Sequence, residues 1–236
     1  VARGPEELKD LPQFFGRGAV ERDLGEYELR IFAEIVEAPQ ISVDDIVARA
    51  RDHRAHGADV IDLGALPATP FPHLGEAVAA LKAEGLAVSV DSLDPEDLIA
   101  GARAGADYLL SLSVETLWVA EEVEAVPVLI PTTPTDQDSL YRAIDALQAK
   151  GRPFLADAIL DPVHFGFTDA LLRYRELRRR YPDVAIMMGT GNLTELTHAD
   201  SVGVNALLCG ICSELGVTAV LTTQVSEHCR RSVAEI

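Results

Sequence analysis

Polar side chains recur in this chain at the point where a short apolar run ends. Asp62 follows Val60 and Ile61, and Asp91 follows the run that ends at Val90. Other runs end in hydroxyl or amide side chains, so the set is rich in oxygen ligands and poor in cations. Its members are Glu34 or Glu37, Asp62, Asp91, Ser111, Ser113, Thr132, Thr133, Asp157, Asp161, Asn192 and the segment from Thr222 to Gln224.

This set of groups predicts a ligand that donates hydrogen bonds. Carboxylates that converge on a half-buried pocket are costly unless they are paired, and no basic residue stands at the same strand ends. A flat heterocycle with an amino-imino edge, such as a guanine or pterin ring, supplies donors, because its ring N–H and exocyclic amine can bond one carboxylate. A ligand gripped mainly through phosphates would lack partners unless Arg230 or Arg231 reached it from a loop.

Other chemistries have less support in the sequence. His164, His198 and His228 lie near the same predicted rim, but no two of them share the spacing of metal ligands, so solvated loop histidines are favoured over a zinc site. A Gly-x-Ser-x-Gly motif is absent, so acyl transfer on that plan has no support. We therefore predict no metal ligands among the site residues.

The elements that must position these groups repeat along the chain. A helical pattern ends in Gly or Pro, a short β-branched run follows, and a polar residue closes it. Because unalternating apolar runs suit strands buried on both faces, each unit predicts a helix and then a parallel strand. Eight runs predict an α/β fold, a parallel eight-stranded (β/α)8 TIM barrel with its site at the carboxyl ends of the strands. The runs are 27–36, 60–64, 86–91, 108–113, 128–133, 153–161, 184–189 and 218–223.

Helix starts and chain ends complete the predicted organisation. The rival open, doubly wound sheet needs a Gly-rich phosphate turn after the first strand, and the segment after Val36 has none.

Residues 1–25 are expected to form a linker or lid, and residues 26–236 the barrel. The chain starts at Val1 and stops inside a helical pattern, so we expect a piece of a longer chain that lacks its last helix. The predicted helix N-caps are Ser42, Asp94, Asp136 and Asp200.

Composition limits the classes of partner. The 236 residues include 20 Lys and Arg against 38 Asp and Glu, a formal net charge of −18. This balance argues against nucleic acid and an anionic membrane as partners, because both attract clustered Lys and Arg. No window approaches the roughly 20 apolar residues of a membrane span. Three cysteines, an odd number, suit a reducing compartment, so a cytoplasmic protein is predicted.

Several of these segments resemble the pterin-binding barrel shared by dihydropteroate synthases and methyltetrahydrofolate-dependent methyltransferases. The similar segments are GADVIDLG at 57–64, VSVDS at 88–92, GADYLLSLS at 105–113 and LDPVHFGFT at 160–168, in the order of that family's second, third, fourth and sixth strands. In the family, the carboxylates that match Asp91 and Asp161 bind the pyrimidine edge of the pterin, so the resemblance implies this role here. Asn192 matches the methyltransferase-like pattern, in which an asparagine contacts the ring, whereas synthases carry a lysine.

The sequence lacks several motifs of the synthases, so it resembles only part of that family's pattern. The fourth-strand asparagine of the synthases is absent, and Ser111 or Ser113 stands in its stretch. The first-loop motif and the eighth-strand Arg-x-His, which hold pyrophosphate in synthases, are also absent, and residues 222–228, with Gln224, occupy the latter place. Over the whole chain the resemblance is to the dihydropteroate synthase-related proteins of methanogens and methylotrophic bacteria, a group associated with tetrahydromethanopterin.

The resemblance implies a pterin-binding enzyme of one-carbon carrier metabolism. The leading hypothesis is a transferase that joins a pterin-methyl unit to an arylamine in tetrahydromethanopterin biosynthesis, with Asp161 and Asn192 as catalytic residues. A methyltransferase that uses an N5-methyl pterin and a non-catalytic pterin-binding subunit remain as alternatives. No tightly bound cofactor is expected, Mg²⁺ enters only if pyrophosphate is the leaving group, and analogy with such barrels predicts a homodimer. The expected substrate-binding residues are Asp62, Asp91, Ser111, Ser113, Asp161, Asn192 and Gln224.

Overall fold

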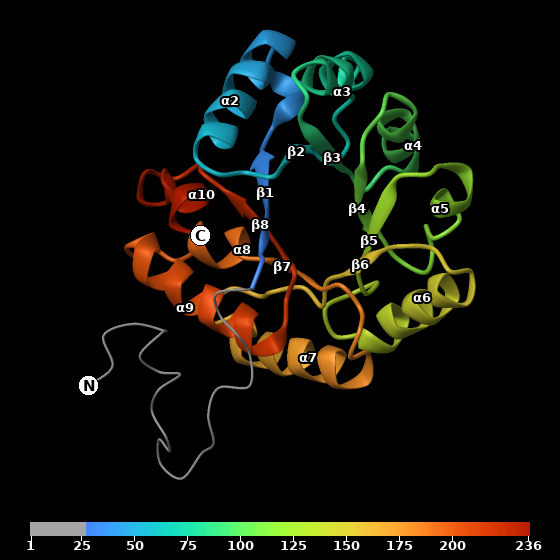
Figure 1. Cartoon of the computed structure of the whole chain (residues 1–236), viewed down its shortest axis with the longest axis vertical. Coiled ribbons are helices and arrows are strands. Elements are labelled where there is room, and N and C mark those ends of the chain that lie inside the picture. Colours follow the sequence, from blue (N-terminus) through green and yellow to red (C-terminus); the bar gives the residue numbers. More distant parts are fainter. Residues whose placement is uncertain (1–26) are drawn as a thin grey trace.

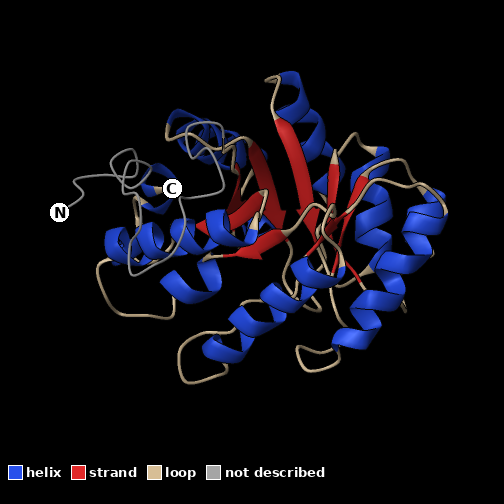
Figure 2. Cartoon of the chain, turned by 60° about the horizontal axis from the view of Figure 1, so that its bottom comes forward, coloured by secondary structure: helices blue, strands red, loops and turns tan. Residues whose placement is uncertain are grey.

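The computed structural model describes residues 27–236, whose strands form one parallel sheet that is nearly closed into a barrel. Figure 1 shows the strands at the centre and the helices around them, and Figure 2 shows the same inner sheet and outer helices from an oblique direction. The predicted α/β barrel is confirmed, while the linker or lid predicted for residues 1–25 lies outside the described residues. The strands are β1 (Arg30–Ile35), β2 (Val60–Gly64), β3 (Ala87–Asp91), β4 (Tyr108–Leu112), β5 (Val126–Leu129), β6 (Leu155–Ala156), β7 (Met187–Gly189) and β8 (Ala219–Thr223).

Four helices begin where the sequence predicts. Each of the four predicted capping side chains accepts a hydrogen bond from a backbone N–H in the first turn of its helix. The capped helices are α2 (Val43–Ala55), α4 (Pro95–Arg103), α6 (Gln137–Ala149) and α9 (Ser201–Leu215). The other helical elements are η2 (Ala38–Gln40), α3 (Leu74–Ala83), α5 (Val119–Glu122), α7 (Phe167–Arg180), α8 (Gly191–Thr194), η3 (Glu227–Cys229) and α10 (Ser232–Glu235).

The strand order places β6 and β7 at the two ends of the sheet. These two strands meet only through an isolated bridge between Ala156 and Ile186, which we call the seam. Strand β6 has two residues, whereas the sequence predicted a strand over 153–161. The backbone leaves the sheet because Ile159 adopts a left-handed conformation with φ 65°. Asp157 and Asp161 therefore belong to a loop that follows β6.

The barrel interior holds an apolar layer beneath a polar one. The apolar layer is a cluster of buried side chains from seven of the eight strands. Side chains two residues apart along a strand point to the same face, so Glu34 lies above Phe32 and Asp62 above Val60. The polar layer thus lies at the carboxyl ends of the strands, directly above the apolar layer, which we call the floor. The floor consists of Phe32, Val60, Leu110, Val128, Leu155, Met187 and Ala219.

Helix α4 packs closely on β3 at Gly101. A Cβ atom at this position would lie 2.7 Å from Cγ2 of Val90. We expect Gly101→Ala to lower the free energy of unfolding in urea by about 1–3 kcal/mol, the usual cost of an overpacked core. The control is Gly210→Ala in α9, where no atom lies within 4 Å of the added Cβ. It should raise stability by up to about 1 kcal/mol, and equal effects of the two variants would contradict the close packing.

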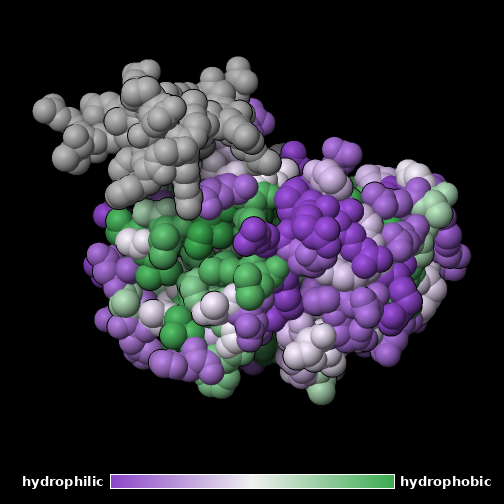
Figure 3. Space-filling model, turned by 90° about the horizontal axis from the view of Figure 1, so that it is seen from below, coloured by the Kyte–Doolittle hydropathy of each residue, from purple (hydrophilic) through white to green (hydrophobic). Residues whose placement is uncertain are grey.

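The surface is unevenly polar. In α9, Val202 is 53% exposed and Leu207 is 62% exposed. The last turn of α7, in contrast, carries three arginines in sequence, residues 178–180. Figure 3 shows hydrophobic residues gathered on one half of the face seen from below and hydrophilic residues on the other half. Among residues 27–236, every helix falls short of the length and apolar character that a membrane span requires.

Candidate functional site

Three carboxylates from neighbouring strands meet inside the mouth of the barrel. Glu34 of β1 stands opposite Asp62 of β2 in the strand register, and Asp91 ends the next strand, β3. One carboxylate oxygen from each residue lies within 4.8 Å of the others. We call Glu34, Asp62 and Asp91 the acidic triad. The sequence predicted the latter two as site residues and placed Glu34 in the wider polar set.

The acidic triad lacks compensating positive charge. No lysine or arginine of residues 27–236 forms an ion pair with any of its members. Asp62 is fully buried, and its Oδ1 accepts a hydrogen bond from the Ser89 hydroxyl while its Oδ2 has no partner among residues 27–236. An unpaired buried oxygen of this kind costs about 1–3 kcal/mol, and more when it is charged. The site therefore favours a proton, a cation or a donor group.

Burial and mutual repulsion hold protons on the triad. Burial, followed by the charges of Asp91 and Glu34, raises the pKa of Asp62 well above its usual range. Burial, followed by the charges of Glu34 and Asp157, raises the pKa of Asp91 to about 7. The pKa of Glu34 is also raised, first by burial and then by the charge of Glu195. All three carboxyl groups of the triad thus have raised pKa values, as groups in functional sites often do.

Gly64 makes room for the Glu34 side chain. A Cβ atom on Gly64 would lie 2.5 Å from Oε1 of Glu34, which is closer than the two atoms can approach. The carboxylate of Glu34 thus lies directly against the backbone of β2. The Cβ of an alanine at position 64 would therefore displace this carboxylate, and the three atoms nearest to that Cβ all belong to Glu34.

Asp157 faces the acidic triad from the end of β6. Its Oδ1 accepts hydrogen bonds from the Tyr174 hydroxyl of α7 and from Ile159 N, the latter 2.7 Å long. Burial raises the pKa of Asp157 to about 6, although these two hydrogen bonds lower it. Its charge in turn adds to the rise in the pKa of Asp91, so the two carboxylates repel each other. The alternation from buried Leu155, two residues earlier, was the sequence signal for this residue.

Asn192 in α8 lies beside Asp157. A Cβ atom on Gly189 would lie 3.2 Å from Asn192 Nδ2 and 3.9 Å from Asp157 Oδ2, so both side chains border this glycine. Asn192 Nδ2 donates a hydrogen bond of 3.2 Å to the carbonyl oxygen of Leu160. The predicted residue Asn192 therefore reaches across the seam, from the segment after β7 to the loop after β6.

Asp161 is engaged by an arginine. Its Oδ2 lies 2.6 Å from an Nη atom of Arg173 in α7, and both side chains are largely buried. The same guanidinium donates to the carbonyl oxygens of Ala158 and Ile159. Arg173 therefore fixes the loop after β6 and neutralises Asp161, whereas Asp157 and the triad receive no such ion pair. Sequence spacing could not reveal this partner, which lies on the following helix.

The remaining predicted residues occupy the rim. Ser111 is half-buried on β4, and the Ser113 hydroxyl accepts a hydrogen bond of 3.2 Å from Glu115 N and so closes a turn. Gln224 Nε2 lies 3.2 Å from Nδ1 of His53, a buried side chain of α2. Gln224 thus belongs to the β1, α2 and β8 side of the mouth. The sequence did not point to His53, which sits on the inner face of a helix.

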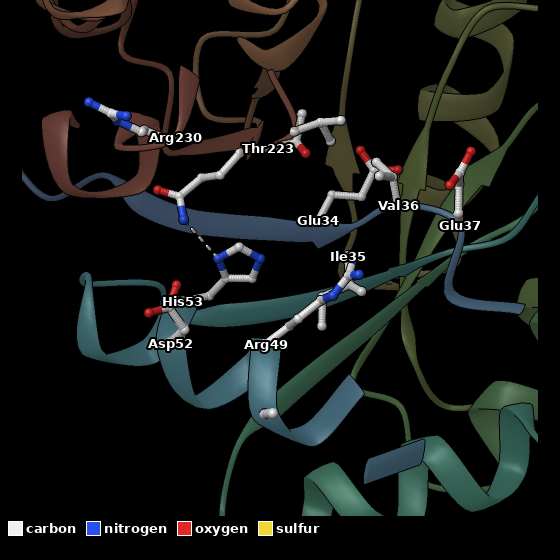
Figure 4. A pocket seen from close by; sticks show the side chains of 12 residues that line it. Glu34, Ile35, Val36, Glu37, Arg49, Asp52, His53, Thr223 and Arg230 are labelled. Carbon is white, nitrogen blue, oxygen red and sulfur yellow. Dashed lines mark hydrogen bonds between the residues drawn. The ribbon is translucent and has the colours of Figure 1, made fainter. Parts of the chain in front are cut away.

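Two cavities adjoin the acidic triad. One has a volume of about 710 Å³ and is lined by Glu34, His53, Gln224 and two arginines, Arg49 and Arg230. Figure 4 shows these side chains, which come from α2, β1 and the segment after β8, with the hydrogen bond between Gln224 and His53 and with the Arg230 guanidinium turned away from Glu34. The other cavity, about 990 Å³, lies between the loops after β2 and β3 and is lined by Asp91 among others. The triad is thus reached from both sides.

The geometry can be compared with known proteins. No family model matches the chain. An uncharacterized protein of Methanocaldococcus jannaschii is 28% identical over 235 residues, which cover 89% of this chain and 44% of that protein. The chain thus spans less than half the length of this relative.

Solved structures show similarity at the level of the backbone. A Yersinia pestis dihydropteroate synthase bound to a pterin-sulfa conjugate aligns with a TM-score of 0.66 and 16% identity, over 93% of this chain and 94% of that one. The Xanthomonas albilineans dihydropteroate synthase in complex with 7,8-dihydropteroate aligns with a TM-score of 0.65 and 19% identity, over 88% of this chain and 89% of that one. The chain therefore has the barrel fold of the dihydropteroate synthases, which confirms the sequence resemblance at the level of the fold.

Proposed function

We propose that the chain is a pterin-binding enzyme whose ring site lies between Asp91 and Asp157. The observation that carries the proposal is a pair of carboxylates at the carboxyl ends of β3 and β6, Asp91 and Asp157, neither held in an ion pair among the described residues, with Asn192 beside Asp157. A pterin ring presents two adjacent N–H donors on its pyrimidine edge, which is the compensation that these carboxylates lack. The fold neighbours, named as dihydropteroate synthases, agree with this ligand class.

Each residue of the proposed ring site has a free polar atom. The hydrogen bonds that Asp157 accepts from Tyr174 and Ile159 both end on Oδ1, which leaves Oδ2 beside Asn192 for the ring. Asn192 Nδ2 donates its hydrogen bond to the carbonyl oxygen of Leu160, and the amide oxygen of Asn192 remains available as an acceptor. Asp91 accepts no side-chain hydrogen bond from residues 27–236. Asp161, predicted from the resemblance, borders this site through the loop that Arg173 holds.

The reaction proposed for this site is a transfer of a pterin-methyl unit to an arylamine in tetrahydromethanopterin biosynthesis. The arylamine nitrogen forms a bond to the exocyclic methylene carbon, the leaving group departs with the bonding electrons, and the amine releases a proton. Arg49 and Arg230 support this reaction, because they line the cavity beside Glu34 and could meet a departing anion. Asn192 in place of a lysine favours the second candidate, a methyltransferase that binds an N5-methyl pterin.

Calorimetric titration with a 7,8-dihydropterin tests the ligand class. We expect saturable binding by the intact chain in chelator, weakened about 10- to 100-fold in Asp157→Asn because one charge-assisted hydrogen bond is worth about 1.5–3 kcal/mol. The matched variant Asp161→Asn should lose less affinity, since Arg173 already occupies that carboxylate. No binding by the folded chain to any pterin would overturn the proposal. A larger loss in Asp161→Asn would assign the ring to Asp161 instead.

A further inference from the structure

We propose that Glu34, Asp62 and Asp91 bind one divalent cation of the oxygen-preferring class, Mg²⁺ or Mn²⁺. The three carboxylates come from three adjacent strands, and their nearest oxygens lie within 4.8 Å of one another. Bonds from oxygen to Mg²⁺ are about 2.1 Å long, which places the ligands of one ion about 3–4 Å apart. Small rotations of the side chains are enough to close the triad on such an ion.

The unpartnered oxygen of Asp62 is the independent observation that points to a ligand. Ser89 fixes Oδ1 and so orients the carboxylate, as an outer-shell hydrogen bond does for metal ligands. Oδ2 remains without a donor although the side chain is 0% exposed. A buried polar atom is ordinarily paired, so this oxygen marks a place for a positive or donating group.

A flat ring does not satisfy this oxygen. Asp62 is covered completely, whereas Asp91 is only half-covered and lines the cavity of about 990 Å³. A pterin can therefore reach Asp91 from the mouth but not Asp62 behind it. A cation is much smaller than the ring, and Glu34, whose carboxylate lies close to that of Asp62, lines the cavity of about 710 Å³.

The ligand set indicates the class of metal. All three side chains offer carboxylate oxygens, and no histidine or cysteine of residues 27–236 joins the cluster. Hard cations prefer such ligands, while Zn²⁺ is usually held by nitrogen and sulfur. Three charges against a divalent ion leave a net charge of about −1, which removes most of the repulsion within the triad. Three protein ligands also leave positions for water or a substrate group.

The cation and the proposed pterin share one residue without competing for the same atom. Asp91 has two carboxylate oxygens, so one can face the ion and the other the ring. A bound cation also keeps Asp91 ionised, which is the form that accepts hydrogen bonds from ring donors. The metal inference goes beyond the proposed function and is tested without a pterin.

Titration of the metal-free, intact chain with Mn²⁺, followed by electron paramagnetic resonance, tests the inference. We expect one Mn²⁺ per chain, displaced by excess Mg²⁺, and affinity at least tenfold weaker in Asp62→Asn. Gly64→Ala keeps all three carboxylates but displaces Glu34, so it should weaken Mn²⁺ binding as well. The control is Asp161→Asn, whose carboxylate pairs with Arg173 outside the triad and whose Mn²⁺ affinity should be unchanged.

Two results would overturn the cation site: no stoichiometric Mn²⁺ binding by the folded chain, or equal affinity in the folded Asp62→Asn variant. Circular dichroism of each variant establishes that it is folded. Because pterin binding is measured separately in chelator, a failed Mn²⁺ titration leaves the pterin proposal standing. Failure to bind pterin leaves the cation site standing in the same way.

Discussion

At pH 8 and without divalent cations, the Asp62→Asn variant is expected to be more stable than the unaltered chain by about 2 kcal/mol. The variant removes a buried carboxylate that has an unpartnered oxygen and two acidic neighbours. An amide keeps the shape and the hydrogen bond from Ser89 while it carries no charge. Urea unfolding of both chains in chelator measures the difference in the free energy of unfolding.

The pH dependence gives this prediction its sign. The pKa of Asp62 is higher in the folded chain than in the unfolded chain, so its favourable contribution is complete below the unfolded value of about 4. That contribution is lost as the pH rises toward the folded pKa. The advantage of Asp62→Asn should therefore be absent at pH 4 and should grow as the pH rises toward the folded pKa.

A matched variant separates this effect from a general one. Asp161→Asn breaks the ion pair with Arg173, so it should lower stability at pH 8. Saturating Mn²⁺ should stabilise the unaltered chain and remove the advantage of Asp62→Asn, because only the unaltered triad binds the ion strongly. If Asp62→Asn were the less stable chain at pH 8 in chelator, the interpretation of the triad as a costly cluster would be wrong.

The affinity for a dihydropterin in chelator is expected to rise between pH 6 and pH 7, with a slope that approaches tenfold per pH unit. Asp91 must be ionised to accept two donors from the ring, and its pKa is about 7. Binding linked to the loss of one proton changes by about 1.4 kcal/mol per pH unit. Above pH 7 the affinity should become constant, and below pH 6 protonation of Asp157, whose pKa is about 6, should steepen the dependence.

The variant Asp91→Asn tests the origin of this dependence. It should bind the dihydropterin about 100-fold more weakly at pH 8, which corresponds to about 3 kcal/mol. Its affinity should be nearly constant between pH 6 and pH 8, because the group that titrates is gone. Asp161→Asn should retain the slope of the unaltered chain. A pH-independent affinity in the unaltered chain would exclude Asp91 as the acceptor.

Local patterns predicted the elements well because local interactions determine them. Ser42, Asp94, Asp136 and Asp200 cap their helices through bonds to residues two or three positions away, and such contacts can be read from spacing. Strand β2 was predicted at its observed bounds, since it is a short apolar run after a helix. The closure of the barrel follows from repeating this unit eight times.

The arrangement of the candidate site depends on contacts between residues far apart in the sequence, which the spacing of residues cannot predict. The apolar residues before Asp161 suggested that β6 continues to it, but the left-handed Ile159 ends the extended backbone earlier. Arg173 then pairs with Asp161, whereas Asp157 is in no ion pair among residues 27–236 and its charge raises the pKa of Asp91. The meeting of Glu34 with Asp62 depends on strand register, and the sequence alone placed them only at similar depths.

The seam has a consequence for how occupancy of the mouth affects the whole sheet. Strands β6 and β7 share a single bridge, so each leaves backbone groups of its edge without the ladder that the other strands have. Asp157 stands on one side of this gap and Asn192 on the other. A molecule that is hydrogen-bonded to both side chains links the two edges of the sheet. Its binding therefore stabilises the closed form of the barrel. Amide protons near Ala156 and Ile186 then exchange with solvent at a rate set by the ligand concentration.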